Sequence, residues 1–157
     1  TPLQPEGFMT NAAIGSINSG SATLLTPDSL IAVTGQIKTG YNPRYAFNRL
    51  TRAVVRQMKD TTGQYLWQIG NLAGGLPNSL NGYEYIELPD MPDIAGAATP
   101  VIFGDFSNYI IGDGRGMIVI RDDYSAKRSG KVEYTFFKRV TGLVRKPEAF
   151  KKIAISV

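Results

Sequence analysis

Helix-starting patterns lie in the first third of this sequence, and strand-like patterns dominate the rest. Thr26 followed by Pro27 is a favourable N-cap with proline at the first helical position, which predicts a helix over 26–40. Asn48 is expected to cap a second helix over 50–59. From Asn81 onward, short apolar runs bounded by Gly or Asp predict strands. Helices followed by a series of strands favour an α+β fold over alternating βαβ units.

The expected strands are short, with one exception. They are 45–47, 65–67, 83–88, 101–103, 109–111, 117–120 and 131–144, with a last short element over 149–155. The longest, 131–144, carries aromatic side chains that we expect to be buried. In the second helix, the side formed by Leu50, Val54, Val55 and Met58 is expected to face the core, opposite a row of basic residues that face water.

The chain contains no Cys and no His, and these absences exclude several kinds of site. Disulfides, thiol nucleophiles, the usual zinc sites and every His-based triad are ruled out. No apolar run approaches the roughly 18–20 residues that a membrane span needs, and the first residues do not resemble a signal peptide. We expect a protein that is not an enzyme, needs no cofactor and does not bind a membrane.

Two motifs that could carry chemistry have simpler explanations. The glycine-rich run 112–116 resembles a dinucleotide loop, but it lies between two expected strands and opens no helix. We interpret it as a hairpin turn. Asp122 and Asp123 could hold a hard cation, but no EF-hand spacing follows, so turn residues at the end of a strand are the better interpretation.

Charge is distributed unevenly along the chain. Residues 1–114 hold six Lys or Arg against nine Asp or Glu, whereas residues 115–157 hold eleven against four. We interpret five basic residues of this second part as a surface for contact between subunits: Lys127, Arg128, Lys131, Lys138 and Arg139. A nucleic-acid-binding surface and a simple solvated strand face remain open alternatives.

Five short stretches, taken in order, span nearly the whole sequence and carry a family resemblance. They are Pro5-Glu6-Gly7-Phe8-Met9, the run from Met58-Lys59-Asp60 to Gln64-Tyr65-Leu66, Leu80-Asn81-Gly82-Tyr83, Ile102-Phe103-Gly104-Asp105-Phe106, and Arg139-Val140-Thr141-Gly142 with Pro147-Glu148-Ala149-Phe150. Together they resemble the major capsid proteins of tailed phages, the Hong Kong 97-like family. After the third stretch the family has Pro-Val, where this chain has Glu84-Tyr85.

The resemblance implies a fold and a division of the chain. The fold would be the α+β Hong Kong 97-like capsid fold, with a mixed sheet and flanking helices in its axial domain. Residues 1–24 would be an entry segment after a spine helix that precedes this sequence. Residues 25–125 would form the axial domain, and residues 126–157 would supply strands that return to the peripheral domain.

The resemblance also implies a function. The protein would be a structural subunit of an icosahedral phage head, assembling with other copies of itself into pentamers and hexamers that enclose the genome. It would lie in the virion capsid, and in the host cytoplasm during assembly, with indirect contact to packaged DNA. Portal, scaffold or decoration proteins are possible further partners. A loop that faces the capsomer axis is expected to include Gly70, Asn71, Gly74, Gly75, Pro77 and Asn78.

Some members of that family join their subunits through an isopeptide bond between Lys and Asn, with a catalytic Glu. The Asn and Glu positions fall on Gly130 and Phe137 here, so we expect no such cross-linking. Two other functions remain open: a bacterial nanocompartment (encapsulin-type) shell protein, which shares the fold, and a nucleic-acid-binding module that uses the basic C-terminal region.

Overall fold

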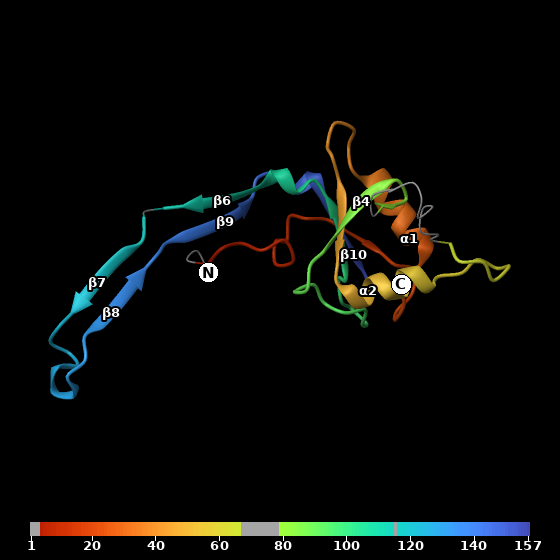
Figure 1. Ribbon diagram of the computed structural model, residues 1–157. Coiled ribbons are helices and arrows are strands. Elements are labelled where there is room, and N and C mark those ends of the chain that lie inside the picture. The colour runs from red at the N-terminus through yellow and green to blue at the C-terminus, as the bar shows by residue number, and fades with distance from the viewer. Residues whose placement is uncertain (1–3, 67–78, 115) are drawn as a thin grey trace, which may run out of the picture.

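The computed structural model describes residues 4–66, 79–114 and 116–157. They form a compact part and a long two-stranded arm that leaves it on one side (Figure 1). The N-terminal segment runs beside the base of the arm before it enters the compact part, where the C-terminus also lies (Figure 1).

A six-stranded mixed sheet forms the centre of the compact part. In spatial order its strands are β1 (Ser16–Asn18), β10 (Phe150–Ala154), β5 (Val101–Gly104), β2 (Arg44–Phe47), β4 (Tyr83–Glu87) and β3 (Ser79–Leu80). The pairs β1–β10 and β2–β4 are parallel, and the other pairs are antiparallel. Together with the helices this sheet confirms the α+β prediction. Because β1 and β10 come from opposite ends of the sequence, the sheet unites residues from all three predicted ranges, whose assignment to domains stays a prediction.

Both helices start where the sequence predicted. The helix α1 (Pro27–Ala32) continues into a 3-10 turn over Val33–Gln36, and the Thr26 hydroxyl accepts a hydrogen bond from the Ser29 amide. At α2 (Arg49–Gln57), the Asn48 carbonyl oxygen Oδ1 accepts from the Thr51 amide at 2.7 Å. Each cap satisfies an amide that would otherwise lack a partner in the first helical turn.

The predicted inward side of the second helix is right for Val55, which is buried, and for Met58, which packs against the core, but it is wrong for Leu50 and Val54. Leu50 is 63% exposed and Val54 is 41% exposed, whereas Thr51 and Val55 are buried against the sheet. Thr51 and Val55 are one turn apart, so they lie on the same side of the helix and turn Leu50 and Val54 outward. On the polar side, Arg52 forms an ion pair with Glu87 of β4.

The sheet is covered on both faces, and successive residues of its inner strands point to opposite sides. On one face, Tyr45, Phe47 and Phe103 pack with α1 and with Val55 of α2. The other face is covered by the N-terminal segment and nearby loops, where the buried residues are Ile14, Ala46, Met91, Ile102, Val144, Ala149 and Phe150. This second layer lies at the base of the arm.

Two tight turns lie on either side of residues 67–78. Asn81 and Gly82 both have positive φ, 52° and 83°, as a tight hairpin between β3 and β4 requires. Asp60 Oδ1 accepts from the Thr62 and Gln64 amides and closes the other turn. The expected strand over 65–67 is reduced to one bridge between Lys59 and Tyr65 within the described residues.

The arm consists of two antiparallel ladders in series. Near the compact part β6 (Tyr109–Asp113) pairs with β9 (Val140–Val144), and farther out β7 (Ile118–Asp122) pairs with β8 (Glu133–Phe137). More residues separate Asp113 from Ile118 than separate Phe137 from Val140. The first strand therefore bulges where the ladders meet, and a bulge bends a ribbon.

Two predictions about this region are wrong. The glycine-rich run is not a hairpin turn, because the chain passes through it from β6 to β7 and continues outward (Figure 1). The hairpin turn follows Asp122 instead and contains a 3-10 turn over Lys127–Ser129. The expected strand 131–144 is divided into β8 and β9 by a break at Lys138 and Arg139. The bulge in the partner strand causes this division, and the sequence of either strand alone does not reveal it.

Candidate subunit interface

The outer half of the arm has apolar side chains on both faces. Residues that pair directly across an antiparallel ladder share a face. One face therefore holds Val119 with Phe136 and Arg121 with Tyr134, and the opposite face holds Ile118 with Phe137 and Ile120 with Thr135. A strand with large apolar residues at successive positions is typical of a sheet covered on both sides.

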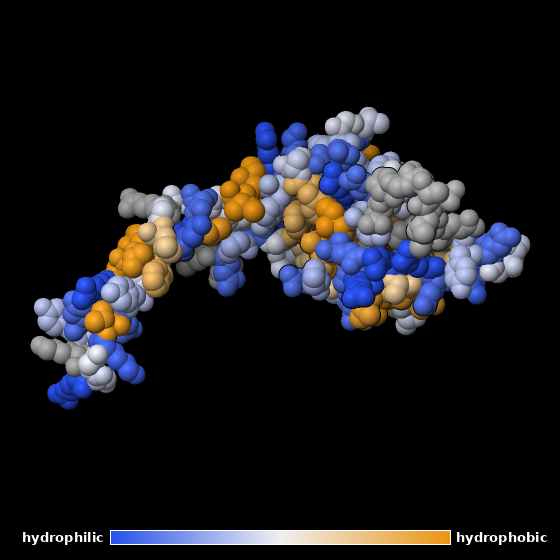
Figure 2. Space-filling model, viewed as in Figure 1, coloured by the Kyte–Doolittle hydropathy of each residue, from blue (hydrophilic) through white to orange (hydrophobic). Residues whose placement is uncertain are grey.

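These side chains are exposed in the single chain. Phe136 is 60% exposed and Phe137, on the opposite face, is 52% exposed. Ile118, Val119 and Ile120 of the facing strand are each about half exposed, and Figure 2 shows apolar residues gathered along the arm. A two-stranded ribbon is at best marginally stable in water, and contiguous apolar surface usually marks a binding site. Such exposed apolar surface on both faces is typical of a sheet that further protein covers.

An aromatic cluster fixes the base of the arm to the compact part. Phe8 of the N-terminal segment lies 4.6 Å from Tyr109 of β6, 5.4 Å from Phe106 and 5.0 Å from Phe150 of β10, measured between ring centroids. Tilted and edge-on ring pairs at these distances are favourable beyond the area that they bury. The first strand of the arm thus starts from a rigid support.

Hydrogen bonds join the same N-terminal segment to the arm. The Glu6 amide donates to the Gly142 carbonyl at 2.8 Å, and the Tyr109 hydroxyl donates to the Glu6 carbonyl at 2.8 Å. Gly142 has no side chain, and a Cβ there would overlap the Tyr109 hydroxyl. The backbone of the segment, the tyrosine and the glycine form one compact contact at the base of β9.

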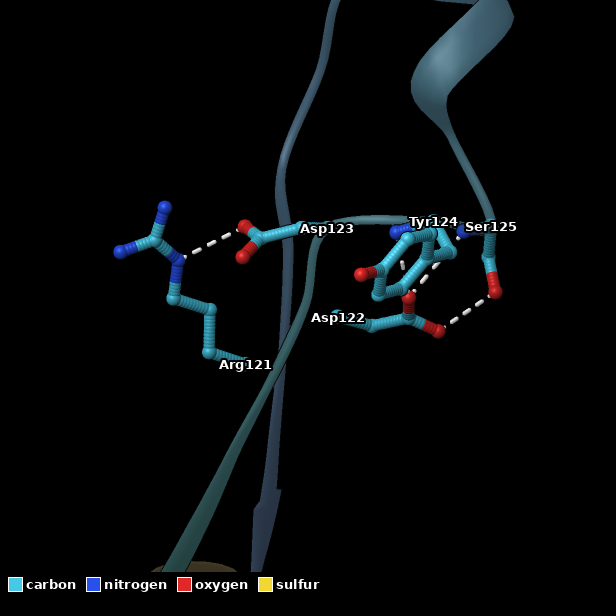
Figure 3. Close-up of polar contacts among 5 residues, drawn as sticks. All are labelled: Arg121, Asp122, Asp123, Tyr124 and Ser125. Atoms are coloured by element: carbon cyan, nitrogen blue, oxygen red, sulfur yellow. Dashed lines mark hydrogen bonds and ion pairs between the residues drawn. The ribbon is translucent and has the colours of Figure 1, made fainter.

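The tip of the arm is organised by its two aspartates (Figure 3). Asp122 Oδ1 accepts from the Tyr124 amide at 2.7 Å and from the Ser125 amide at 3.1 Å, while the Ser125 hydroxyl donates to Oδ2. Arg121 Nε pairs with Asp123 at 2.7 Å. The hydrogen bond from the Ser125 hydroxyl, followed by those from the two amides, holds the pKa of the Asp122 carboxyl below its usual value. This confirms the interpretation of both aspartates as turn residues.

The five basic residues expected at a subunit interface all lie on the arm, but they do not form one patch. The backbone of Lys127 is in the 3-10 turn at the tip, with Arg128 and Lys131 exposed nearby. Lys138 and exposed Arg139 lie at the break between β8 and β9, and Lys138 Nζ pairs with Asp113 Oδ2 of β6 at 2.8 Å. The structure therefore separates them into a tip group and a middle group.

A small polar cluster ties two surface loops of the compact part together. Glu148 accepts from Lys38 Nζ at 2.8 Å through Oε2 and from the Tyr41 hydroxyl at 2.9 Å through Oε1. These two hydrogen bonds, that from Lys38 first, lower the pKa of the Glu148 carboxyl. We interpret the arrangement as a structural contact, because Lys38 and Tyr41 both donate to the Glu148 carboxylate.

One pocket of the described part of the chain is small and polar. A pocket of about 160 Å³ lies between Asn42, Pro43, Arg44, Gly82, Tyr83 and Glu84. It is smaller than the roughly 300–1,000 Å³ of typical ligand pockets, and the Arg44–Glu84 ion pair borders it at 3.1 Å. Among the described residues, no group of acidic side chains is arranged to hold a metal ion, and no helix has the length and apolarity to cross a membrane.

Two expectations had different outcomes. The axis loop of Gly70, Asn71, Gly74, Gly75, Pro77 and Asn78 lies outside the described residues and stays a prediction.

The two apolar faces of the arm were missed, because the aromatic residues of 131–144 were expected to be buried within the chain. The consecutive apolar residues at 118–120 and 136–137 were the available signal, since neighbours in a strand point to opposite faces.

The sequence matches the family model described as "Phage capsid family" over residues 1–155. No curated protein matches it. Among solved structures, the "Capsid of empty GTA particle computed with C5 symmetry" has a TM-score of 0.81 at 32% identity, covering 98% of this chain and 57% of that chain. The "Capsid of native GTA particle computed with C5 symmetry" has a TM-score of 0.81 at 34% identity, covering 98% of this chain and 56% of that chain. The structure "Gordonia phage Cozz" has a TM-score of 0.61 at 19% identity, covering 93% of this chain and 51% of that chain. At that identity it shows a likeness of fold alone.

The chain spans little more than half of the length of these solved chains. Within that span, the likeness includes the arm as well as the compact part, since nearly all of this chain is covered. The mixed α+β architecture and the resemblance found in the five sequence stretches are both confirmed. The chain belongs to the phage capsid family and has the Hong Kong 97-like fold.

Proposed function

We propose that this chain is part of a structural subunit of an icosahedral phage head. The subunit assembles with copies of itself into pentamers and hexamers, and the closed shell encloses the genome. Its place is the virion capsid, with the host cytoplasm as the site of assembly. In this role the protein catalyses no reaction, and contact with packaged DNA is indirect.

The observation that carries the proposal is the arm with two exposed apolar faces. A shell subunit must have surfaces whose exposure to water is unfavourable in the single subunit and which symmetric neighbours bury in the shell. Burial of the exposed part of Phe136 alone would remove on the order of 120 Å² from water, which corresponds to roughly 3 kcal/mol per copy. Because every copy contributes the same contacts, the gain is repeated throughout a closed shell.

Three finer proposals accompany this function. Residues 25–125 form the axial domain, and residues 126–157 contribute strands to the peripheral domain. The loop with Gly70, Asn71, Gly74, Gly75, Pro77 and Asn78 faces the capsomer axis, so its deletion from the complete gene product is expected to impair capsomer assembly. The basic groups at the tip and in the middle of the arm meet acidic surfaces on other subunits; portal, scaffold or decoration proteins are further partners.

Electron microscopy of the complete product of the gene that encodes this chain tests the function. Closed shells, or rings of five and six, are the expected result. Soluble subunits that bind DNA with a steep dependence on salt would overturn it and favour a nucleic-acid-binding module. Shells that enclose a protein cargo instead of a genome would favour a nanocompartment.

The arm is tested by one substitution on each face, Phe136→Ser and Ile118→Ser. Both side chains are at least half exposed, so the folded subunit is expected to keep its thermal stability while shell formation needs a higher protein concentration. Leu24→Ser is the matched control, because Leu24 is equally exposed, at 63%, but lies in the compact part. If both arm variants form shells at the same protein concentration as Leu24→Ser and the unchanged protein, the assignment of the arm to assembly is contradicted.

A further inference from the structure

The outer turn of the arm presents one aromatic side chain to the surroundings. Tyr124 is 82% exposed, the largest value among the exposed aromatic residues of the described part of the chain. It follows the end of β7, in the connection between β7 and β8, and this connection is the part of the arm farthest from the compact part (Figure 1). The described residues of its own chain therefore give it almost no cover.

The turn around this tyrosine is ordered by contacts that leave its ring out. Asp122 binds the amides of Tyr124 and Ser125, at 2.7 and 3.1 Å, and also accepts from the Ser125 hydroxyl (Figure 3). Arg121 and Asp123 pair with each other at 2.7 Å. Both carboxylates next to the tyrosine are thus engaged within the turn, and the ring is the group left for an outside partner.

Such an arrangement lowers the cost of binding. A loop that is already fixed loses less conformational freedom when it docks, and a tyrosine has few rotatable bonds for its area. Exposed aromatic residues at protein interfaces often carry a large share of the binding energy when they enter a pocket. The contacts around Asp122 contribute nothing to the ring's own burial, so their effect is to hold its position.

We propose that Tyr124 is an anchor by which the tip of the arm docks onto a second copy of this chain. The proposal rests on the proposed function, because a shell places another copy at a fixed position relative to each tip. The flanking basic residues Arg128 and Lys131 are exposed, which favours a receiving surface with an acidic rim. Residues 1–108 of a second copy carry eight acidic against six basic side chains, a net negative charge that complements these basic residues.

Two substitutions in the complete gene product test the anchor. Tyr124→Ser is expected to raise the protein concentration needed for shell formation by about 30-fold, as loss of an interface anchor does. Tyr124→Phe keeps the ring and is expected to assemble within about threefold of the unchanged protein. The thermal unfolding midpoint of the unassembled subunit should be nearly the same for all three, because the Tyr124 side chain is 82% exposed.

A third variant identifies the partner. Tyr124→p-benzoylphenylalanine, irradiated in assembled particles, is expected to yield a covalent pair of two copies of this chain, located by mass spectrometry. A cross-link to any other virion protein, or none at all, would overturn the proposal. If the unchanged protein forms shells and Tyr124→Ser forms them equally well, the anchor is refuted while the shell function stands. If the unchanged protein forms no shells or rings, the proposed function itself is refuted.

Discussion

Gly142→Ala is a single-methyl change whose effect follows from the contact at the base of the arm. Gly142 is buried in β9, and an added Cβ would overlap the Tyr109 hydroxyl, with Tyr109 Cζ at 3.0 Å. The tyrosine must then move, although it also donates to the Glu6 carbonyl and packs on Phe8. We expect the substitution to loosen the N-terminal segment and the first strand of the arm together.

The size of the effect combines three contributions. Overpacking a filled site costs about 1–3 kcal/mol, and loss of the Tyr109 hydrogen bond costs about 1 kcal/mol. Alanine also lowers the conformational entropy of the unfolded chain, which offsets about 0.4–1 kcal/mol of this loss. This gain applies because Gly142 is not among the glycines with positive φ, so alanine can adopt its backbone conformation. The net loss in free energy of unfolding is therefore roughly 1–3 kcal/mol, measured by urea denaturation at neutral pH.

Gly116→Ala is the matched control, because a Cβ at Gly116 meets no atom within 4 Å. It should change the free energy of unfolding by no more than about 0.5 kcal/mol. Adding Tyr109→Phe removes the nearest atom, so Gly142→Ala should cost less in that background by more than about 0.5 kcal/mol. Equal stability of Gly142→Ala and Gly116→Ala, or strict additivity with Tyr109→Phe, would refute the steric reasoning.

Two further predictions concern the compact part. Asn48→Ala removes the cap on the Thr51 amide and the donor to the Met91 carbonyl at 3.0 Å, so urea denaturation should show a loss of roughly 2–4 kcal/mol; a loss below about 1 kcal/mol would contradict this. Glu148 has a lowered pKa in the folded chain, so its contribution to stability is present above the ordinary glutamate pKa of 4.5 and is lost as pH falls through the lowered value. Glu148→Gln should therefore flatten the acid side of the stability–pH curve, and an unchanged slope below pH 4.5 would show that Lys38 and Tyr41 do not stabilise the carboxylate in solution.

Local sequence patterns predicted the features of this fold that depend on a few neighbouring residues. Thr26 and Asn48 cap helices, as each pattern suggested. In each case the residue type and its nearest amides decide the conformation. Such contacts depend only weakly on the rest of the molecule.

Features that depend on distant partners were harder to predict. Leu50 and Val54 lie on the same predicted apolar side as Val55 and Met58, and only the position of the sheet decides which of these residues turn inward. In the same way, the glycine-rich run 112–116 suits a turn as well as a bulge. Its conformation follows from pairing with residues about 25 positions later, which local composition does not encode.

The proposed interface on the arm carries both basic and apolar side chains, and the sequence drew attention only to the basic ones. The five basic residues do lie on the arm, but large apolar side chains are exposed there as well. Large side chains in a strand are usually assigned to the core of their own chain. Here they stay exposed because the ribbon has only two strands and extends away from the compact part (Figure 1).

The position of β10 in the sheet has a consequence for biosynthesis. This strand joins β1 to β5, yet its residues 150–154 are made long after residues 16–18. At about 5–20 residues per second, roughly 7–27 s separate their appearance on the ribosome. During that interval β1 has no partner strand, and the apolar arm is synthesised before β10 is complete. Folding of this chain is therefore completed after translation has passed residue 154, and its yield should respond to temperature and chaperone supply more than that of a protein with local strand pairing.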